Sequence, residues 1–289
     1  MKLDGRREST NVDDRRRMGG GTKAGMGLGG IVIAALIAWM MGGNPLDALQ
    51  QAGGLDILTN GGATEQEITP EQEELAKFSK QILAGTEDVW TKIFREKYGR
   101  EYSVPGMVLF TGSVQSACGA ATAQVGPFYC SGDQRVYLDL TFFSQMRQQL
   151  GAGGDFAYAY VIAHEVGHHV QYLTGVLDQA HEQMARLSEK DANKISVRLE
   201  LLADFYAGIW GYYDNQMFGS LEDGDIEEAI DCAQKIGDNY LQQKAQGYTV
   251  PDSFTHGTSE QRMRWLKLGL TTGDLSYAQK IFQLPESEL

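Results

Sequence analysis

A histidine–glutamate–histidine pattern in the second half of the chain has the spacing of a metal-dependent hydrolase. It reads His164-Glu165-Val166-Gly167-His168, an HExxH motif. On a helix, His164 and His168 lie about one turn apart on one face, so both imidazoles could bind the same metal ion. Glu165 lies about 100° around the helix, where its carboxylate could deprotonate a metal-activated water without binding the metal. The alternative is a helix whose histidines make ordinary hydrogen bonds.

Two acidic residues repeat the same spacing further along the chain. Glu200 and Asp204 stand four apart in the largely apolar segment 198–210. Burying carboxylates is costly without a cationic partner, and a catalytic zinc needs a third protein ligand. We expect Glu200 to be that ligand and Asp204 to accept a hydrogen bond from a ligand histidine. A solvated acidic face, with Arg198 as a local partner, is the alternative.

The remaining histidines have different surroundings. His256 lies in a predicted loop that enters a helix, within residues 251–266. It could donate a hydrogen bond to the oxyanion of a tetrahedral intermediate, and Arg262 could support it by pairing with a carboxylate. A capping or surface histidine is the alternative for His256. We expect His169 to make a structural hydrogen bond and His181 to lie on the surface.

The elements that must position these residues suggest an α+β fold. Thr69-Pro70-Glu71-Gln72 has the pattern of a capping box, which predicts a helix from Pro70 to about Tyr98 with a break near Gly85. Short strands should follow, forming a small antiparallel sheet ahead of the HExxH helix, and the C-terminal half should be mainly helical. The expected strands are 107–111, 127–130 and 135–140, and the expected helices 141–150, 155–173, 190–213, 225–247 and 260–270.

The N-terminal part of the chain has the composition of a membrane anchor. Residues 1–24 carry seven Lys/Arg and four Asp/Glu, and residues 25–43 carry no charge. A helix over 25–43 would span roughly 28 Å, about one hydrocarbon core. We therefore predict a basic cytoplasmic segment over 1–24, a transmembrane helix over 25–43, a flexible linker over 44–68 and one zinc-binding domain over 69–289. A cleaved signal peptide and a buried soluble helix are the alternatives.

The sidedness of this arrangement follows from charge. The positive-inside rule places the N-terminus in the cytoplasm and the zinc-binding domain across the inner membrane, outside the cytoplasm. The net charge of −13 argues against nucleic acid as a partner, because such binding needs a basic surface.

The cysteines fit the same compartment. Cys118 and Cys130 flank a stretch of small, turn-forming residues, which suits a disulfide-closed loop in an oxidising compartment. Metal binding by these two cysteines is the alternative, although no CxxC spacing supports it. Cys232 would be left over as a small buried apolar residue.

The chain resembles the bacterial "putative neutral zinc metallopeptidase" family over nearly its whole length. The matching stretches are ACGAATAQVGPFYC, QRVYLDLTFF, AYVIAHEVGHHVQ, ELLAD, GDIEEAI and VPDSFTHGTSEQRMRW. The resemblance implies a membrane-anchored zinc peptidase of zincin-like fold, with one Zn²⁺ per chain and a peptide or protein as substrate.

Two shorter resemblances imply roles for single residues. HExxH followed by ExxxD is similar to the gluzincin pattern, in which the later Glu binds zinc, matching Glu200, and the Asp supports a ligand histidine, matching Asp204. The THGTSEQR segment is similar to the THPxxxxR stretch of membrane-bound prenyl-protein and heat-shock metallopeptidases. The histidine there stabilises the transition state, which matches His256. Gly257 stands where that pattern has proline.

We therefore expect a membrane-anchored zinc endopeptidase whose zinc is held by His164, His168 and Glu200, with Glu165 as general base. The strand at 136–140 is expected to pair with an extended substrate at the sheet edge.

Two other functions stay open. One is an anchored binding or assembly module with a structural zinc, for which His169 or His256 would be the fourth ligand. The other is a different zinc-dependent amide hydrolase, which usually adds a cysteine ligand; Cys130 is the nearest candidate before the motif.

Overall fold

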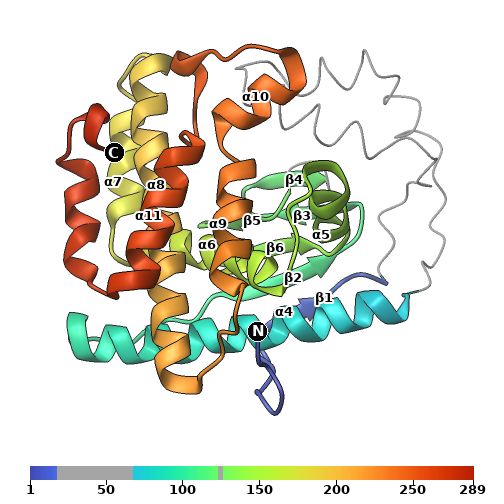
Figure 1. Ribbon diagram of the computed structural model, residues 1–289. Helices are drawn as coiled ribbons and strands as arrows, with labels where there is room; N and C mark the ends of the chain where they lie inside the picture. The colour runs from blue at the N-terminus through green and yellow to red at the C-terminus, as the bar shows by residue number, and fades with distance from the viewer. Residues whose placement is uncertain (18–67, 123–125) are drawn as a thin grey trace.

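The computed structural model describes residues 1–17, 68–122 and 126–289, and it combines a small sheet with a larger helical part (Figure 1). The α+β class is confirmed, and the mostly helical C-terminal half is as expected of a zincin-like domain. In Figure 1 the long helix α4 (Pro70–Ile93) runs along one side of the sheet, and the remaining long helices form the other part of the molecule.

The main sheet is mixed, so the prediction of an antiparallel sheet was wrong. Its strand order is β1-β2-β6-β5. The first three strands in that order run parallel, and β5 is antiparallel to β6. The strands are β1 (Val12–Asp14), β2 (Gly106–Phe110), β5 (Phe128–Cys130) and β6 (Arg135–Asp139). Between β2 and β6 the chain forms β5 and a separate ribbon of β3 (Ser113–Ser116) and β4 (Gly119–Thr122), and this connection lets β2 and β6 run in the same direction.

The position of β6 corrects a second expectation. It lies between β2 and β5 and is hydrogen-bonded to both, so it offers no free edge to a substrate. The edge strand on this side of the sheet is β5.

Helix α4 begins as the sequence predicted. Thr69 caps it, and Gln72 completes the capping box. The predicted break at Gly85 is absent, and the helix continues to Ile93 and then into a π-helical turn, η1 (Phe94–Tyr98). A Cβ at Gly85 would lie only 2.9 Å from side-chain atoms of Arg6 and Asp214. The glycine therefore serves a close tertiary contact and does not interrupt the helix.

The other helices largely follow the predicted ranges. One expected helix, 225–247, is divided at Gly237, a position where a Cβ would overlap the backbone of Ser259. Helix α7 was not predicted. The helices are α5 (Thr141–Gln145), η3 (Met146–Leu150), α6 (Asp155–Leu173), α7 (Val176–Met184), α8 (Glu189–Phe218), α9 (Asp225–Lys235), α10 (Asp238–Gln246), η4 (Pro251–Ser253), α11 (Ser259–Thr272), η5 (Leu275–Phe282) and η6 (Glu286–Glu288).

Residues 1–17 belong to the folded domain, which corrects the prediction of a separate segment over 1–24. Strand β1 pairs with β2. Arg6 forms an ion pair with the buried Asp214 at 2.8 Å, and Ser9 and Asn11 both donate to Glu87. The physical reason is that β1 covers the backbone of β2, which would otherwise be a bare sheet edge.

The predicted transmembrane helix over 25–43 lies outside the described residues, as does the linker except for its last residue. Within the part of the chain that the structure describes, no helix is both long and apolar enough to span a bilayer.

Candidate metal centre

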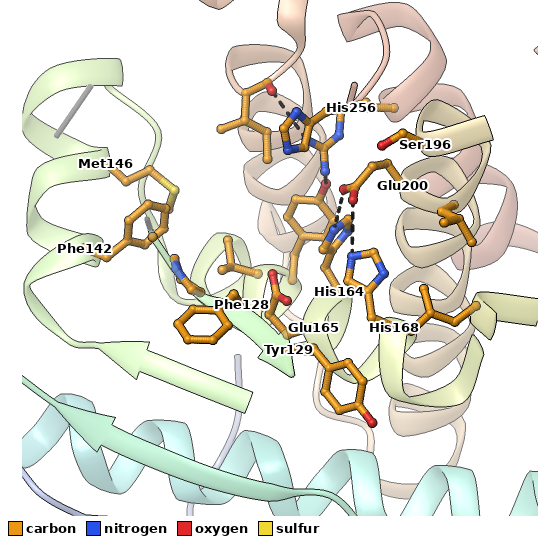
Figure 2. A pocket seen from close by; sticks show the side chains of 18 of the residues that line it. Phe128, Tyr129, Phe142, Met146, His164, Glu165, His168, Ser196, Glu200 and His256 are labelled. Atoms are coloured by element: carbon orange, nitrogen blue, oxygen red, sulfur yellow. Dashed lines mark hydrogen bonds and ion pairs between the residues drawn. The ribbon is translucent and has the colours of Figure 1, made fainter. Parts of the chain in front are cut away.

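Helices α6 and α8 cross closely at the candidate metal centre. Gly167, inside the HExxH motif, faces α8, and a Cβ on it would lie 3.0 Å from the carbonyl oxygen of Ala203. This approach brings His164 and His168 of α6 against Glu200 of α8 (Figure 2). Nε2 of His164 lies 3.1 Å from one carboxylate oxygen of Glu200, and Nε2 of His168 lies 3.5 Å from the other.

These three side chains fit a zinc ion. One donor atom from each lies within 4.8 Å of the others, and among the described residues no further His, Cys, Asp or Glu joins this group. Nδ1 of His164 contacts Asp204 at 2.7 Å, and Nδ1 of His168 contacts Gln171 at 3.3 Å. Both Nε2 atoms therefore face the Glu200 carboxylate. Two imidazoles and one carboxylate are a ligand set of catalytic zinc sites.

Asp204 is fully buried behind His164 and accepts several hydrogen bonds. Arg262 reaches it from α11 with Nε at 2.8 Å and Nη2 at 2.9 Å, and the hydroxyl of Tyr160 donates at 2.6 Å. Arg262 thus pairs with a carboxylate as expected, but this carboxylate holds His164 and not His256. Arg198, the alternative local partner of the acidic pair, donates instead to the carbonyls of Ile281 and Leu284.

The buried charges shift one another's pKa values. Burial by itself lowers the pKa of His164, but Asp204 and Glu200 outweigh it and raise that pKa to about 10. Burial lowers the pKa of His168 to about 4. Burial opposes ionisation of Asp204, yet Arg262 and His164 lower its pKa to about 2. The site therefore favours ionised carboxylates, as a cation-binding site requires.

Glu165 lies beside the two histidines and faces the cleft (Figure 2). Burial raises the pKa of Glu165 to about 7, although His164 opposes this shift. The backbone of Tyr129, on edge strand β5, also lowers the pKa of this carboxyl, which places the strand next to Glu165. The candidate general base thus lies between the histidine pair and strand β5.

His256 also lines the cleft and lies above Glu200 in Figure 2. The buried Asp238, at the start of α10, holds its loop by accepting backbone N–H groups from Thr255 at 2.8 Å, His256 at 2.7 Å and Gly257 at 3.0 Å. Asp238 also lies 3.2 Å from Nδ1 of His256. Burial lowers the pKa of this imidazole, but Asp238 raises it above its usual value. Gly257 has φ +95°, which proline cannot adopt, so the loop differs from the THP pattern.

The cleft that contains these residues has a volume of about 480 Å³. Figure 2 shows Phe128, Phe142 and Met146 grouped on one side of the histidine pair, near Glu165. Val161, one helical turn before Glu165, also lines the cleft. This side is therefore apolar, next to the charged and polar groups of the centre.

The other predicted residues lie apart from the centre. Nδ1 of His169 contacts the Tyr129 hydroxyl at 2.8 Å, and its Nε2 donates to the Ser103 carbonyl at 2.6 Å, so its role is structural as expected. His181 is exposed at the cleft rim. The Cys118–Cys130 disulfide is formed, which confirms that prediction, and Cys232 is buried and free.

Three residues of the centre were missed by sequence reasoning: Tyr160, Gln171 and Asp238. Tyr160 precedes His164 by four residues, and Gln171 follows His168 by three. Helical spacing could have indicated both as polar neighbours of the ligands. No local signal connects Asp238 to His256, because α10 and the loop meet only in the folded chain.

Comparisons with known proteins agree with this centre. The chain is 44% identical over 291 residues to the "Uncharacterized protein YpfJ" of Escherichia coli strain K12, covering 95% of this chain and 96% of that protein. It is 43% identical over 183 residues to the "Uncharacterized protein Rv2575" of Mycobacterium tuberculosis strain H37Rv, covering 60% and 61%. No solved structure matches significantly. Residues 1–280 match the family described as "Putative neutral zinc metallopeptidase", and the chain belongs to that family.

Proposed function

We propose that the chain is a zinc-dependent endopeptidase. The observation that carries this proposal is the convergence of His164, His168 and Glu200 in an open cleft, with Glu165 beside them. We assign the first three as zinc ligands, with one Zn²⁺ per chain. The chemistry that zinc supplies when bound is polarisation of a peptide carbonyl and a lower pKa for water.

The chain's own residues supply the proton transfers and the charge stabilisation. Glu165 takes a proton from the attacking water and passes it to the leaving amine, a role that suits a carboxylate with a pKa near neutrality. His256, held by Asp238, donates a hydrogen bond to the oxyanion that develops on the substrate. Asp204 keeps Nδ1 of His164 as the donor, so that Nε2 faces the metal position.

The cleft also indicates how a peptide would lie. Edge strand β5 lines it through Phe128 and Tyr129, so an extended substrate can pair with β5 in place of the interior strand β6. The apolar side formed by Phe142, Met146 and Val161 suits a large apolar side chain next to the cleaved bond. Arg262 is committed to Asp204 and does not offer a clamp for a terminal carboxylate, which favours cleavage within a chain.

The two other functions have less support. A closed structural zinc site needs a fourth protein ligand, yet His169 is bonded to Ser103 and Tyr129, and within the described residues the metal-binding group holds three donors. An amide hydrolase with a cysteine ligand would need Cys130, whose sulfur is in the disulfide. That disulfide also supports a location in an oxidising compartment.

Zinc content tests the ligand set. Purified full-length chain should carry about one zinc, and Glu200→Ala should lose most of it because a three-ligand site is left with two. Glu260→Ala, an exposed glutamate on α11, is the matched control. Zinc that is indifferent to Glu200 would remove the third ligand from the proposal.

Activity tests the general base. Glu165→Gln should retain zinc but cleave a peptide library at least about 100-fold more slowly, because general-base catalysis contributes on that order. Cleavage at the wild-type rate by this variant would contradict the mechanism. Equal zinc content in both proteins is the control, measured on the same samples.

A further inference from the structure

One buried polar side chain beside the metal centre has no part in the mechanism above. Gln171 lies on α6 three residues after His168, and none of its surface is exposed. Its amide Nε2 donates to the carbonyl of Leu199 at 2.7 Å, and its Oε1 lies 3.3 Å from Nδ1 of His168. We propose that Gln171 is a positioning residue that holds His168 in the tautomer able to bind zinc; this inference rests on the proposed zinc site.

The Leu199 carbonyl determines which way the amide points. A carbonyl oxygen can only accept, so the NH₂ end of Gln171 must face Leu199. The oxygen end then faces His168, and Nδ1 of His168 must carry the proton that it donates. Nε2 of His168 is left with a free lone pair, directed towards the Glu200 carboxylate 3.5 Å away.

The same amide connects the two helices that carry the ligands. Leu199 directly precedes Glu200 on α8, and His168 is on α6. The two hydrogen bonds of Gln171 therefore connect an imidazole on one helix with the backbone beside the carboxylate on the other. His164 has a carboxylate partner, Asp204, whereas His168 has a neutral amide. The two imidazoles are thus oriented without a second negative charge behind them.

Two substitutions separate positioning from ordinary structural support. Gln171→Met keeps the side-chain length and loses both hydrogen bonds. Gln171→Glu also loses the amide donor to Leu199 but keeps an acceptor for Nδ1 of His168. A purely structural residue would therefore give both variants the same zinc affinity. We expect Gln171→Met to raise the zinc Kd by about 10- to 100-fold. Gln171→Glu should raise it less, because its carboxylate still accepts from Nδ1 of His168 although it faces the Leu199 carbonyl without a donor.

The readouts are the zinc Kd of the full chain, measured by competition with a chelator, and the absorption spectrum of the cobalt(II)-substituted protein. The spectrum should change in Gln171→Met, because the imidazole is free to rotate. Thr174→Val is the matched control: it removes the hydrogen bonds from the Thr174 hydroxyl to the backbone carbonyls of Val170 and Gln171 at the end of α6, and it touches neither a ligand nor the Gln171 side chain. It should show the wild-type Kd and spectrum.

The outcomes distinguish the two proposals. Equal Kd values for Gln171→Met and Gln171→Glu, or a Thr174→Val protein as weak as Gln171→Met, would overturn the positioning role alone. A wild-type chain that binds no zinc would overturn both the positioning role and the proposed peptidase.

Discussion

Asp204 and Arg262 form a buried ion pair directly behind the imidazole of His164. Neither side chain is more than 5% exposed, and Tyr160 adds a hydrogen bond to the same carboxylate. A buried charge is stabilised by its oppositely charged partner, because water cannot solvate it when the partner is removed. The pair therefore supports both the fold and the orientation of one proposed zinc ligand.

Removing the arginine should destabilise the whole domain. Arg262→Met leaves the Asp204 carboxylate without its cation, so we expect the free energy of unfolding to fall by about 3–5 kcal/mol. Urea unfolding of chelator-treated protein measures this without a contribution from zinc. Lys267→Met, at an exposed position further along α11, should change stability by less than about 0.5 kcal/mol. Equal losses in the two variants would mean that the ion pair contributes nothing specific.

His256 should affect turnover and leave zinc binding unchanged. His256→Phe keeps a planar ring but removes the hydrogen-bond donor, so kcat should fall by about 100- to 1000-fold while KM changes little. His181→Phe, at the exposed rim of the same cleft, is the control and should retain near wild-type kcat. A His256→Phe enzyme with wild-type kcat would exclude His256 from the reaction.

The closest helix crossing in this part of the molecule is that of α8 and α11. A Cβ on Gly208 would overlap the backbone of Leu266, and a Cβ on Gly269 would overlap that of Phe205. The two glycines allow the helix backbones to touch, and this contact holds α11 where Arg262 can reach Asp204 on α8. The crossing therefore places the Arg262 guanidinium next to Asp204, the carboxylate that contacts the proposed zinc ligand His164.

A single methyl group should disturb this crossing. Gly269→Ala forces α11 away from α8, and overpacking of this kind costs about 1–3 kcal/mol. The Tm should fall by roughly 2–4 °C for each kcal/mol. In an isolated helix, replacing glycine by alanine would stabilise the helix. A fall in Tm would therefore show that the contact with α8 outweighs helix propensity. Thr271→Ala, exposed on the same helix, should leave Tm nearly unchanged.

Local sequence determines some of these elements and not others. The capping box at Thr69 and the apolar run of α6 are local signals: the first correctly predicted the start of α4, and the second both ends of α6. Strand β1 consists of Val12, Asp13 and Asp14, and it is a strand only because β2 lies beside it. The close approach of Gly237 to Ser259, 22 residues away, likewise exists only in the folded chain. The spacing of His164 and His168 could be recognised in the sequence because one helix carries both residues. The contact of Gly167 with α8 could not be recognised, because it forms only in the folded chain.

At the scale of the whole molecule, the N-terminal residues are attached to the domain at several separate points. Arg6 pairs with Asp214 and lies 3.8 Å above the ring of Phe218, both on α8. Arg16 is buried and donates to the Gln72 carbonyl at the start of α4 at 2.9 Å. A fragment that begins near Thr69 would lack these contacts, so the full chain is the protein to study.

Removing the contact between Arg6 and Asp214 should lower the free energy of unfolding of the domain. Arg6→Met leaves Asp214, which is 1% exposed, without its cation, and we expect a loss of about 3 kcal/mol in urea unfolding. Arg17→Met, at an exposed position, is the control and should be neutral. If Arg6→Met is as stable as the control, residues 1–17 are not docked on the domain in solution.

The pairing of β1 with β2 joins residues that precede the predicted transmembrane segment to residues that follow it. Arg17 and Thr69 both belong to one folded body, in which β1 and β2 are hydrogen-bonded to each other, and residues 18–67 lie outside the described part of the chain. The arginines that the positive-inside rule counts are largely bound to carboxylates of the domain or of β1 itself: Asp214, Asp88, Asp13 and Asp14. The N-terminus and the disulfide therefore belong to one folded body, in which these arginines balance acidic side chains.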